Sequence, residues 1–199
     1  VSWPEAMALQ LSPDSRWIIS LAESPWAAAL HDATEPSGKW QPARVWQPFG
    51  ADPRHGRVTL LWMPDSRHVF TLGDDGEATL FDMATGLPGA APHGRPCGSV
   101  ARPGWRVKTG SVFTQPGDGL PAGLVIHAGD EGSGRFCAQT LAVAADGALS
   151  LGQPLEFTHD ERPKMGFAHS GRLLAVHVIG PGADPPHHRR LRVRSVLCE

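Results

Sequence analysis

Histidine and cysteine are the side chains in this sequence most able to act as nucleophiles, bases or metal ligands. His93 and Cys97 lie four residues apart, and a thiol beside an imidazole could be an activated nucleophile if a third group oriented the histidine. The densest histidine cluster is His187 and His188, with Asp184 nearby. Because adjacent side chains on a strand point to opposite faces, both histidines cannot easily bind one metal ion. We therefore expect neither a catalytic dyad nor a metal site in these segments.

The wider sequence carries no established catalytic motif. It has no Gly-x-Ser-x-Gly elbow, no His-Glu-x-x-His, no P-loop and no Gly-x-Gly-x-x-Gly after a strand. The Gly- and Pro-rich segment around His93 and Cys97 is typical of a linker, and residues 180–190 are typical of an exposed loop. The sequence therefore predicts a protein that is not an enzyme and that uses no cofactor and no metal.

A basic run near the C-terminus and two tryptophans are the candidate partner-binding residues. On a strand, Arg190, Arg192 and Arg194 would share one face and could bind a phosphate or an acidic peptide. Trp26 and Trp40 lie beside prolines, where an exposed tryptophan would anchor a partner. The alternative is that these tryptophans fill gaps between sheets. The formal net charge of −2 argues against nucleic acid as the main partner.

Composition limits the class of protein. With 23 Gly and 19 Pro among 199 residues, many short elements joined by turns are favoured over long helices. A hydrophobic content of 41% argues against disorder, and no apolar run approaches the length of about 18 residues that crosses a membrane.

Cysteine and arginine usage indicate the compartment and the source. Three widely spaced cysteines without a CxxC motif are typical of separate thiols in a reducing compartment, so we expect a cytoplasmic protein. The chain begins with Val1, so a removed signal peptide or a longer parent chain remains an alternative. The 15 Arg against 3 Lys suggest a GC-rich, bacterial genome.

A repeat of about 52 residues organises the chain. Pro-Asp-Ser-Arg occurs at 13–16 and again 51 positions later at 64–67, each time before an apolar stretch. Weaker copies lie at 115–119 and 168–172. Proline followed by an acidic residue or glycine favours a reverse turn between antiparallel strands, with Asp14 and Asp65 at the second corner. Four turns in phase predict four units, with approximate bounds 1–50, 51–100, 101–155 and 156–199.

Each unit is predicted to be a small antiparallel sheet. In the second unit, residues 58–62 and 68–72 flank the proline turn, and 77–82 alternates after a second turn. In the third unit, residues 136–143 and 148–151 flank an Asp-Gly turn that is typical of a hairpin. About four short antiparallel strands, repeated radially, make a propeller blade. The predicted fold is therefore an all-β propeller of about four blades, each with four antiparallel strands.

This pattern resembles the blades of bacterial WD-repeat β-propellers. The second unit matches best, through Met63–Arg67, Asp74-Asp75-Gly76, Leu80-Phe81-Asp82 and Ala84-Thr85-Gly86. Phe81 stands where the family usually has Trp. The resemblance implies a hydrogen-bond network in each blade between a histidine before the first strand and an aspartate in the second turn. His55 and Asp75 would fill these roles in the second blade, and His159 the first role in the fourth.

The resemblance also implies a function, a non-catalytic scaffold whose loops bind a protein or peptide. Two alternatives stay open: a ligand-binding or hydrolytic propeller with a polar central channel, and the regulatory propeller of a larger enzyme. The ring could be completed by further blades of a longer parent chain, by four blades closing on themselves, or by a second copy. We expect the longer parent, because terminal repeats normally differ from internal ones. No membrane partner is expected.

Overall fold

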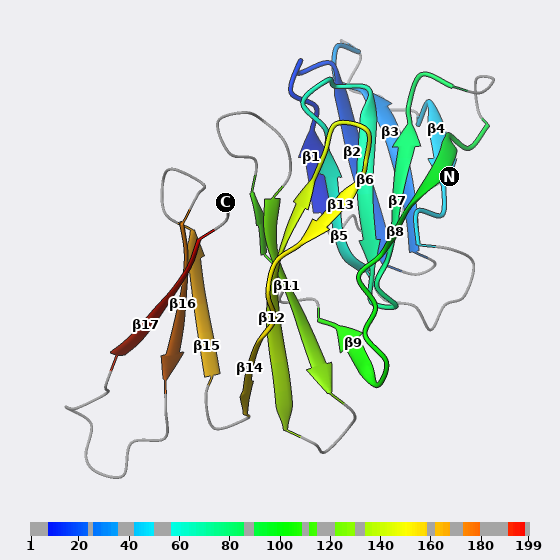
Figure 1. Cartoon of the computed structure of the whole chain (residues 1–199). Coiled ribbons are helices and arrows are strands. Elements are labelled where there is room, and N and C mark those ends of the chain that lie inside the picture. The colour runs from blue at the N-terminus through cyan, green and yellow to red at the C-terminus, as the bar shows by residue number, and fades with distance from the viewer. Residues whose placement is uncertain are drawn as a thin grey trace. The chain divides into compact units, whose positions relative to one another are not determined.

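The computed structural model describes residues 8–23, 26–35, 42–49, 57–85, 90–108, 112–114, 122–129, 134–158, 162–167, 173–179 and 191–197. These residues contain β-strands and no helix, and the strands form four antiparallel sheets that follow one another along the chain (Figure 1). Two compact parts, Val1–Val100 and Ala101–Glu199, are described separately, as the N-terminal half and the C-terminal half. The all-β prediction is confirmed.

The N-terminal half contains two sheets of four strands, blade one and blade two, each paired in chain order. Blade one comprises β1 (Ala8–Leu11), β2 (Trp17–Glu23), β3 (Trp26–Asp32) and β4 (Arg44–Trp46). Blade two comprises β5 (Arg57–Trp62), β6 (His68–Gly73), β7 (Glu77–Asp82) and β8 (His93–Ser99). The strands predicted at 58–62, 68–72 and 77–82 agree with β5, β6 and β7 to within one residue.

The repeated Pro-Asp-Ser-Arg segment forms the same tight turn in both blades. Ser15 and Ser66 both adopt positive φ values, 60° and 55°, and their backbone N–H groups donate to the carbonyls of Ser12 and Met63. The preceding aspartate stabilises each turn, since its carboxylate accepts backbone N–H groups two or three residues ahead. The recurring four residues therefore encode the turn that joins the first strand of each blade to the second.

An apolar core fills the space between blades one and two. Ile19, Leu21, Ala28, Leu30 and Trp46 of blade one pack with Leu60, Trp62, Val69 and Phe81 of blade two, all at most 9% exposed. The rings of Trp46 and Phe81 lie 6.1 Å apart. Trp46 is thus a core residue.

Polar contacts between the two blades join positions about one repeat apart. The indole N–H of Trp62 donates to the carbonyl of Gln10 at 3.3 Å, and the Gln10 side chain donates to the carbonyl of Leu60. The backbone N–H of Asp14 donates to the hydroxyl of Ser66 at 2.9 Å. The contacting residues are therefore separated in sequence by nearly the same number of residues at each contact. Blade two packs on blade one as successive repeats do in a repeat protein.

Blade three, in the C-terminal half, has two interrupted outer strands. Its two central strands, β11 (Ala122–Gly129) and β12 (Arg135–Val143), pair with each other. The other edge of β11 pairs with two short strands, β9 (Trp105–Val107) and β10 (Val112–Thr114). The other edge of β12 pairs with β13 (Leu149–Leu151) and β14 (Leu155–Thr158). The six strands therefore occupy four strand positions. The predicted hairpin is confirmed, and its Gly147 has a φ of 81°, which glycine adopts without strain.

The last sheet, blade four, shows three antiparallel strands in the described residues. They are β15 (Arg162–Phe167), β16 (Leu173–Ile179) and β17 (Leu191–Leu197), paired in that order. Four successive meanders of short antiparallel strands are the blade architecture of a β-propeller.

Candidate functional site

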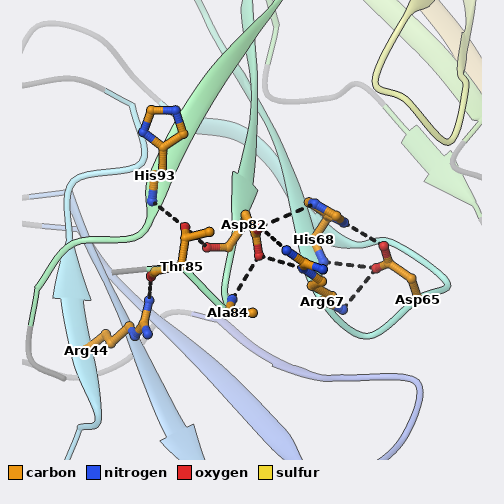
Figure 2. A network of polar contacts seen from close by, with 8 residues as sticks. All are labelled: Arg44, Asp65, Arg67, His68, Asp82, Ala84, Thr85 and His93. Atoms are coloured by element: carbon orange, nitrogen blue, oxygen red, sulfur yellow. Dashed lines mark hydrogen bonds and ion pairs between the residues drawn. The ribbon is translucent and has the colours of Figure 1, made fainter. Parts of the chain in front are cut away.

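A cluster of charged side chains lies at one edge of blade two, where the proline turn meets the end of β7 (Figure 2). We call this cluster the polar edge, comprising Asp65, Arg67, His68 and Asp82. His68 opens β6 and pairs directly with Asp82, the last residue of β7, so the strand register brings these side chains together.

Arg67 and Asp82 form a two-point ion pair. Nε of Arg67 donates to Oδ1 of Asp82 at 2.9 Å, and a terminal guanidinium nitrogen donates to Oδ2 at 2.6 Å (Figure 2). Oδ1 of Asp82 also accepts the backbone N–H of Ala84 at 2.9 Å. The hydrogen bond from Arg67 is the largest cause that lowers the pKa of Asp82, to about 2, so this carboxylate is charged at neutral pH.

His68 lies between two carboxylates. Its Nδ1 is 2.6 Å from Oδ2 of Asp65, and its Nε2 is 4.0 Å from Oδ2 of Asp82. Burial alone would raise the pKa of Asp65, but the hydrogen bond from the His68 side chain and those from the His68 and Arg67 backbones outweigh burial and lower it. Each carboxylate of the polar edge is thus engaged by a side chain and by backbone N–H groups, which favours a bracing role over acid–base chemistry.

The same chemistry recurs at the corresponding edge of blade one. Asp32 accepts the backbone N–H of Thr34 at 2.9 Å and its hydroxyl at 2.6 Å, and hydrogen bonding to Thr34 lowers the pKa of Asp32. Asp14 accepts the hydroxyl of Ser12 at 2.5 Å, which is the main cause lowering its pKa. The guanidinium of Arg44 in β4 donates to the carbonyl of Thr85, joining the two edges (Figure 2). Both blades thus carry carboxylates that backbone N–H groups anchor at this edge.

Blade three holds a second polar group, and this one is largely buried. Strand register places Val107, His127, Cys137 and Glu156 side by side in one row across the sheet. His127 and Cys137 are both 0% exposed. Neither ring nitrogen of His127 has a hydrogen-bond partner within the described part of the chain. Burial, and secondarily the positive charge of Arg102, lower the pKa of His127 to about 4, so the imidazole is neutral at pH 7.

Arg102 covers this row from the solvent side. Its guanidinium donates to Sγ of Cys137 and to Oε1 of Glu156, the latter at 3.2 Å. Glu156 also accepts Arg135 at 2.9 Å, and hydrogen bonds from Arg135 and then Arg102 lower its pKa. The guanidinium groups of Arg102 and Arg135 lie 5.0 and 5.3 Å from the ring centroid of Trp105. A half-exposed layer of charge thus covers a buried thiol and imidazole.

The residues predicted for the turns are described by the structure, whereas most of the predicted partner-binding side chains are not. Asp14 and Asp65 lie in the proline turns, and Asp75 accepts the backbone N–H of Glu77 at 2.9 Å. Predicted residues outside the described part are His55, His159, Trp40 and Arg190. The side chains of Trp26, at the start of β3, and of Arg192 and Arg194, in β17, are likewise not described. The predictions for all seven stay predictions.

The linker predicted around His93 and Cys97 is wrong, because this segment is strand β8. Its proline is tolerated since β8 is an edge strand, and Cys97 is the extra residue of a β-bulge opposite Ala78 and Thr79. The Cys97 thiol donates to the carbonyl of Arg95, and the His93 backbone donates to the hydroxyl of Thr85.

Sequence inspection missed both the Arg67–Asp82 pair and the His127–Cys137 pair. The first had a usable signal, because Arg16 and Asp32 of blade one have nearly the same spacing as Arg67 and Asp82. The second depends on hairpin register. Among the described residues, no group of three or more His, Cys, Asp or Glu side chains is placed to hold a metal ion. No helix in the described ranges could cross a membrane.

Comparison with known proteins identifies the fold. No protein-family model and no curated protein matches the sequence. Among solved structures, a functionally unknown protein from Desulfotomaculum acetoxidans aligns over 100% of this chain and 58% of its own, with 12% identity and a TM-score of 0.53. Two proteins described as "putative 6-phosphogluconolactonase", from Bacteroides uniformis and Bacteroides fragilis, each align over 98% of this chain and 55% of their own, with 13% identity and TM-scores of 0.54 and 0.52.

The chain therefore spans little more than half the length of the structures it matches. At 12–13% identity the similarity shows the fold alone. Together with the four antiparallel sheets, it identifies this chain as an all-β, propeller-type structure.

Proposed function

We propose that this chain is part of a WD-repeat-like propeller that acts as a non-catalytic scaffold and binds a protein or peptide at the rim of blades one and two. The polar edge is the observation that carries this proposal. Its charged groups are held by backbone N–H groups and by one another, yet the side chains of Arg67 and Asp65 remain 55% and 48% exposed. A preorganised surface of this kind loses little side-chain entropy when a charged peptide binds.

A hydrolytic propeller is the second candidate, and it is motivated by the two structures described as 6-phosphogluconolactonases. Hydrolysis of a lactone needs a base with free capacity to activate water. At the polar edge, the Asp65 carboxylate contacts His68, and the Asp82 carboxylate accepts three hydrogen bonds from Arg67 and Ala84. This arrangement favours the scaffold over the hydrolase, with the regulatory part of a larger enzyme as a variant of the scaffold role.

Pull-down from the native source tests the scaffold. We expect capture of a specific partner that is weakened by Arg16→Glu and Asp65→Asn, and that is unchanged by Arg106→Glu, an exposed control in the other half. Trp26→Ala and Trp40→Ala test the remaining predicted anchors. Turnover of 6-phosphogluconolactone that is lost on substituting His68 would overturn the proposal in favour of the hydrolase. We propose a cytoplasmic location, which the three widely spaced cysteines without a CxxC motif support.

The outer face of blade one supports further blades as additional partners. Leu9 and Leu11 are 61% and 54% exposed, whereas Leu60 and Trp62, one repeat later, are 5% and 3% exposed because blade one covers them. Corresponding faces of stacked repeats are normally covered alike. The matched structures extend well beyond the aligned region, so we infer that a blade of the same parent chain, outside residues 1–199, covers Leu9 and Leu11.

Thiol labelling at natural length tests this second proposal. In the natural-length protein we expect Leu11→Cys to be protected from the thiol reagent. Leu151→Cys, at an exposed position in blade three, should be labelled. Labelling of both would contradict the proposal. Protection of Leu11→Cys in a protein of residues 1–199 alone would also contradict it. If that protein is a dimer, a second copy covers Leu11. If it is a monomer, its own fourth blade does.

A further inference from the structure

His127 is a buried polar side chain with unused binding capacity. It is 0% exposed, and both ring nitrogens lack hydrogen-bond partners in the described residues. A buried polar group without a partner is unfavourable, so such a group calls for a ligand, a water molecule or a functional reason. The side chain directly opposite on β12 is Cys137, also 0% exposed. A soft sulfur atom and an imidazole nitrogen thus share one buried face of blade three.

We propose that His127 and Cys137 together bind one soft monovalent metal ion, with Cu(I) as the fitting chemistry. Thiolate and imidazole are the ligands that Cu(I) prefers. Directly opposed residues have Cβ atoms about 4.5–5.5 Å apart, a separation that one ion can bridge with metal–sulfur and metal–nitrogen bonds of about 2.0–2.3 Å. Strand register sets these two donors directly opposite each other, and the described residues hold no group of three or more His, Cys, Asp or Glu side chains placed for a metal ion. Two donors are the number that a two-coordinate Cu(I) ion needs.

The step is a ligand exchange without electron transfer. The S–H bond of Cys137 breaks, its proton passes to solvent, and a bond forms between sulfur and the ion, while neutral His127 donates a nitrogen lone pair. Arg102 already donates to Sγ of Cys137 and would hydrogen-bond the resulting thiolate. Its side chain is 28% exposed and is held by Glu156, so movement of Arg102 provides the route by which the ion enters.

Competition for Cu(I) with a chromogenic chelator, under anaerobic reducing conditions, tests the site. The parent protein carries Cys97→Ser and Cys198→Ser, which leaves Cys137 as the only thiol. We expect one equivalent of Cu(I) per chain, loss of binding in Cys137→Ser, and at least about tenfold weaker binding in His127→Leu. His93→Leu, which removes an exposed histidine on β8, is the matched control and should bind like the parent.

Two further measurements, the stability of the metal-free protein and the ligand set of the loaded protein, test the site independently of affinity. Without metal, His127→Leu should unfold at a higher denaturant concentration than the parent, because an unpartnered buried polar group is removed. X-ray absorption of the loaded parent should show one sulfur and one nitrogen ligand. Lower stability of metal-free His127→Leu would assign His127 a structural hydrogen bond instead. Unchanged Cu(I) affinity in that variant, or a sulfur-only or nitrogen-only ligand set, would also overturn the proposal.

Discussion

Blades two and three each place a histidine against polar side chains, with opposite outcomes. His68 starts β6 at the rim of blade two, is 27% exposed, and lies between the carboxylates of Asp65 and Asp82. His127 lies in the middle strand pair of blade three, is fully buried, and has no hydrogen-bond partner in the described chain. One histidine braces a turn through Nδ1, whereas the other retains its donor and acceptor capacity.

Position within a blade therefore decides what a polar residue can do. At the rim, backbone N–H groups of the turns and water compensate charge, so ionised groups gather there at little cost. Within the sheet, neighbouring backbone groups are already paired with one another, so a polar side chain depends on the side chain opposite it. His127 and the Asp82 carboxylate of the polar edge should therefore respond to acid in different pH ranges.

The largest expected effect is the acid sensitivity caused by His127. Its pKa is lowered from 6.5 to about 4 on folding, so the unfolded chain binds a proton that the folded chain excludes. Excluding this proton costs nothing above pH 6.5, and it lowers the stability of the fold by about 3 kcal/mol as the pH falls from 6.5 towards 4. Urea unfolding at pH 7, 5.5 and 4 measures it. In His127→Leu this part of the pH dependence should disappear, and an unchanged slope would refute the assignment.

Asp82 should act in a lower pH range and with a smaller effect. Its pKa is lowered from 3.8 to about 2, so its contribution is present above pH 3.8 and is lost as the pH falls towards 2. After allowance for solvent screening we expect Asp82→Asn to cost about 1–2 kcal/mol at pH 7 and to flatten the acid limb below pH 4. If Asp82→Asn instead changed the slope between pH 6.5 and 4, the separation of the two sites would be wrong.

Arg102→Gln should change access to blade three more than its stability. Arg102 covers the Cys137 sulfur and contacts the exposed Glu156, so its removal opens a route to the thiol. We expect faster labelling of Cys137 by a small thiol reagent, followed by peptide mapping, with Cys97 as the internal standard. Equal acceleration at both cysteines would indicate general loosening rather than local opening.

The smallest expected effect is that of Arg67→Lys. Lysine retains the charge but cannot make the two parallel hydrogen bonds that Arg67 makes to Asp82. We expect a smaller loss of stability than in Asp82→Asn, measured as the shift in the urea midpoint. A loss as large as that of Asp82→Asn would show that the two-point geometry, rather than charge, stabilises the polar edge.

Much of the rim was predictable and the buried row was not. The Pro-Asp-Ser-Arg turns depend on backbone preferences of four consecutive residues, so Asp14 and Asp65 could be placed from sequence. β8 was missed because Gly and Pro suggest a linker, yet an edge strand with a bulge tolerates both. The contact between Arg102 and Glu156 joins residues 54 positions apart, which no local pattern records.

The repeat, the positions of its turns and the all-β character are encoded locally, because they follow from conformational preferences and from the spacing of apolar residues. Which histidine is braced, and which is buried with no hydrogen-bond partner in the described chain, depends on long-range packing. Those environments depend on the register between paired strands, and a shift of one residue would turn His127 and Cys137 to different faces.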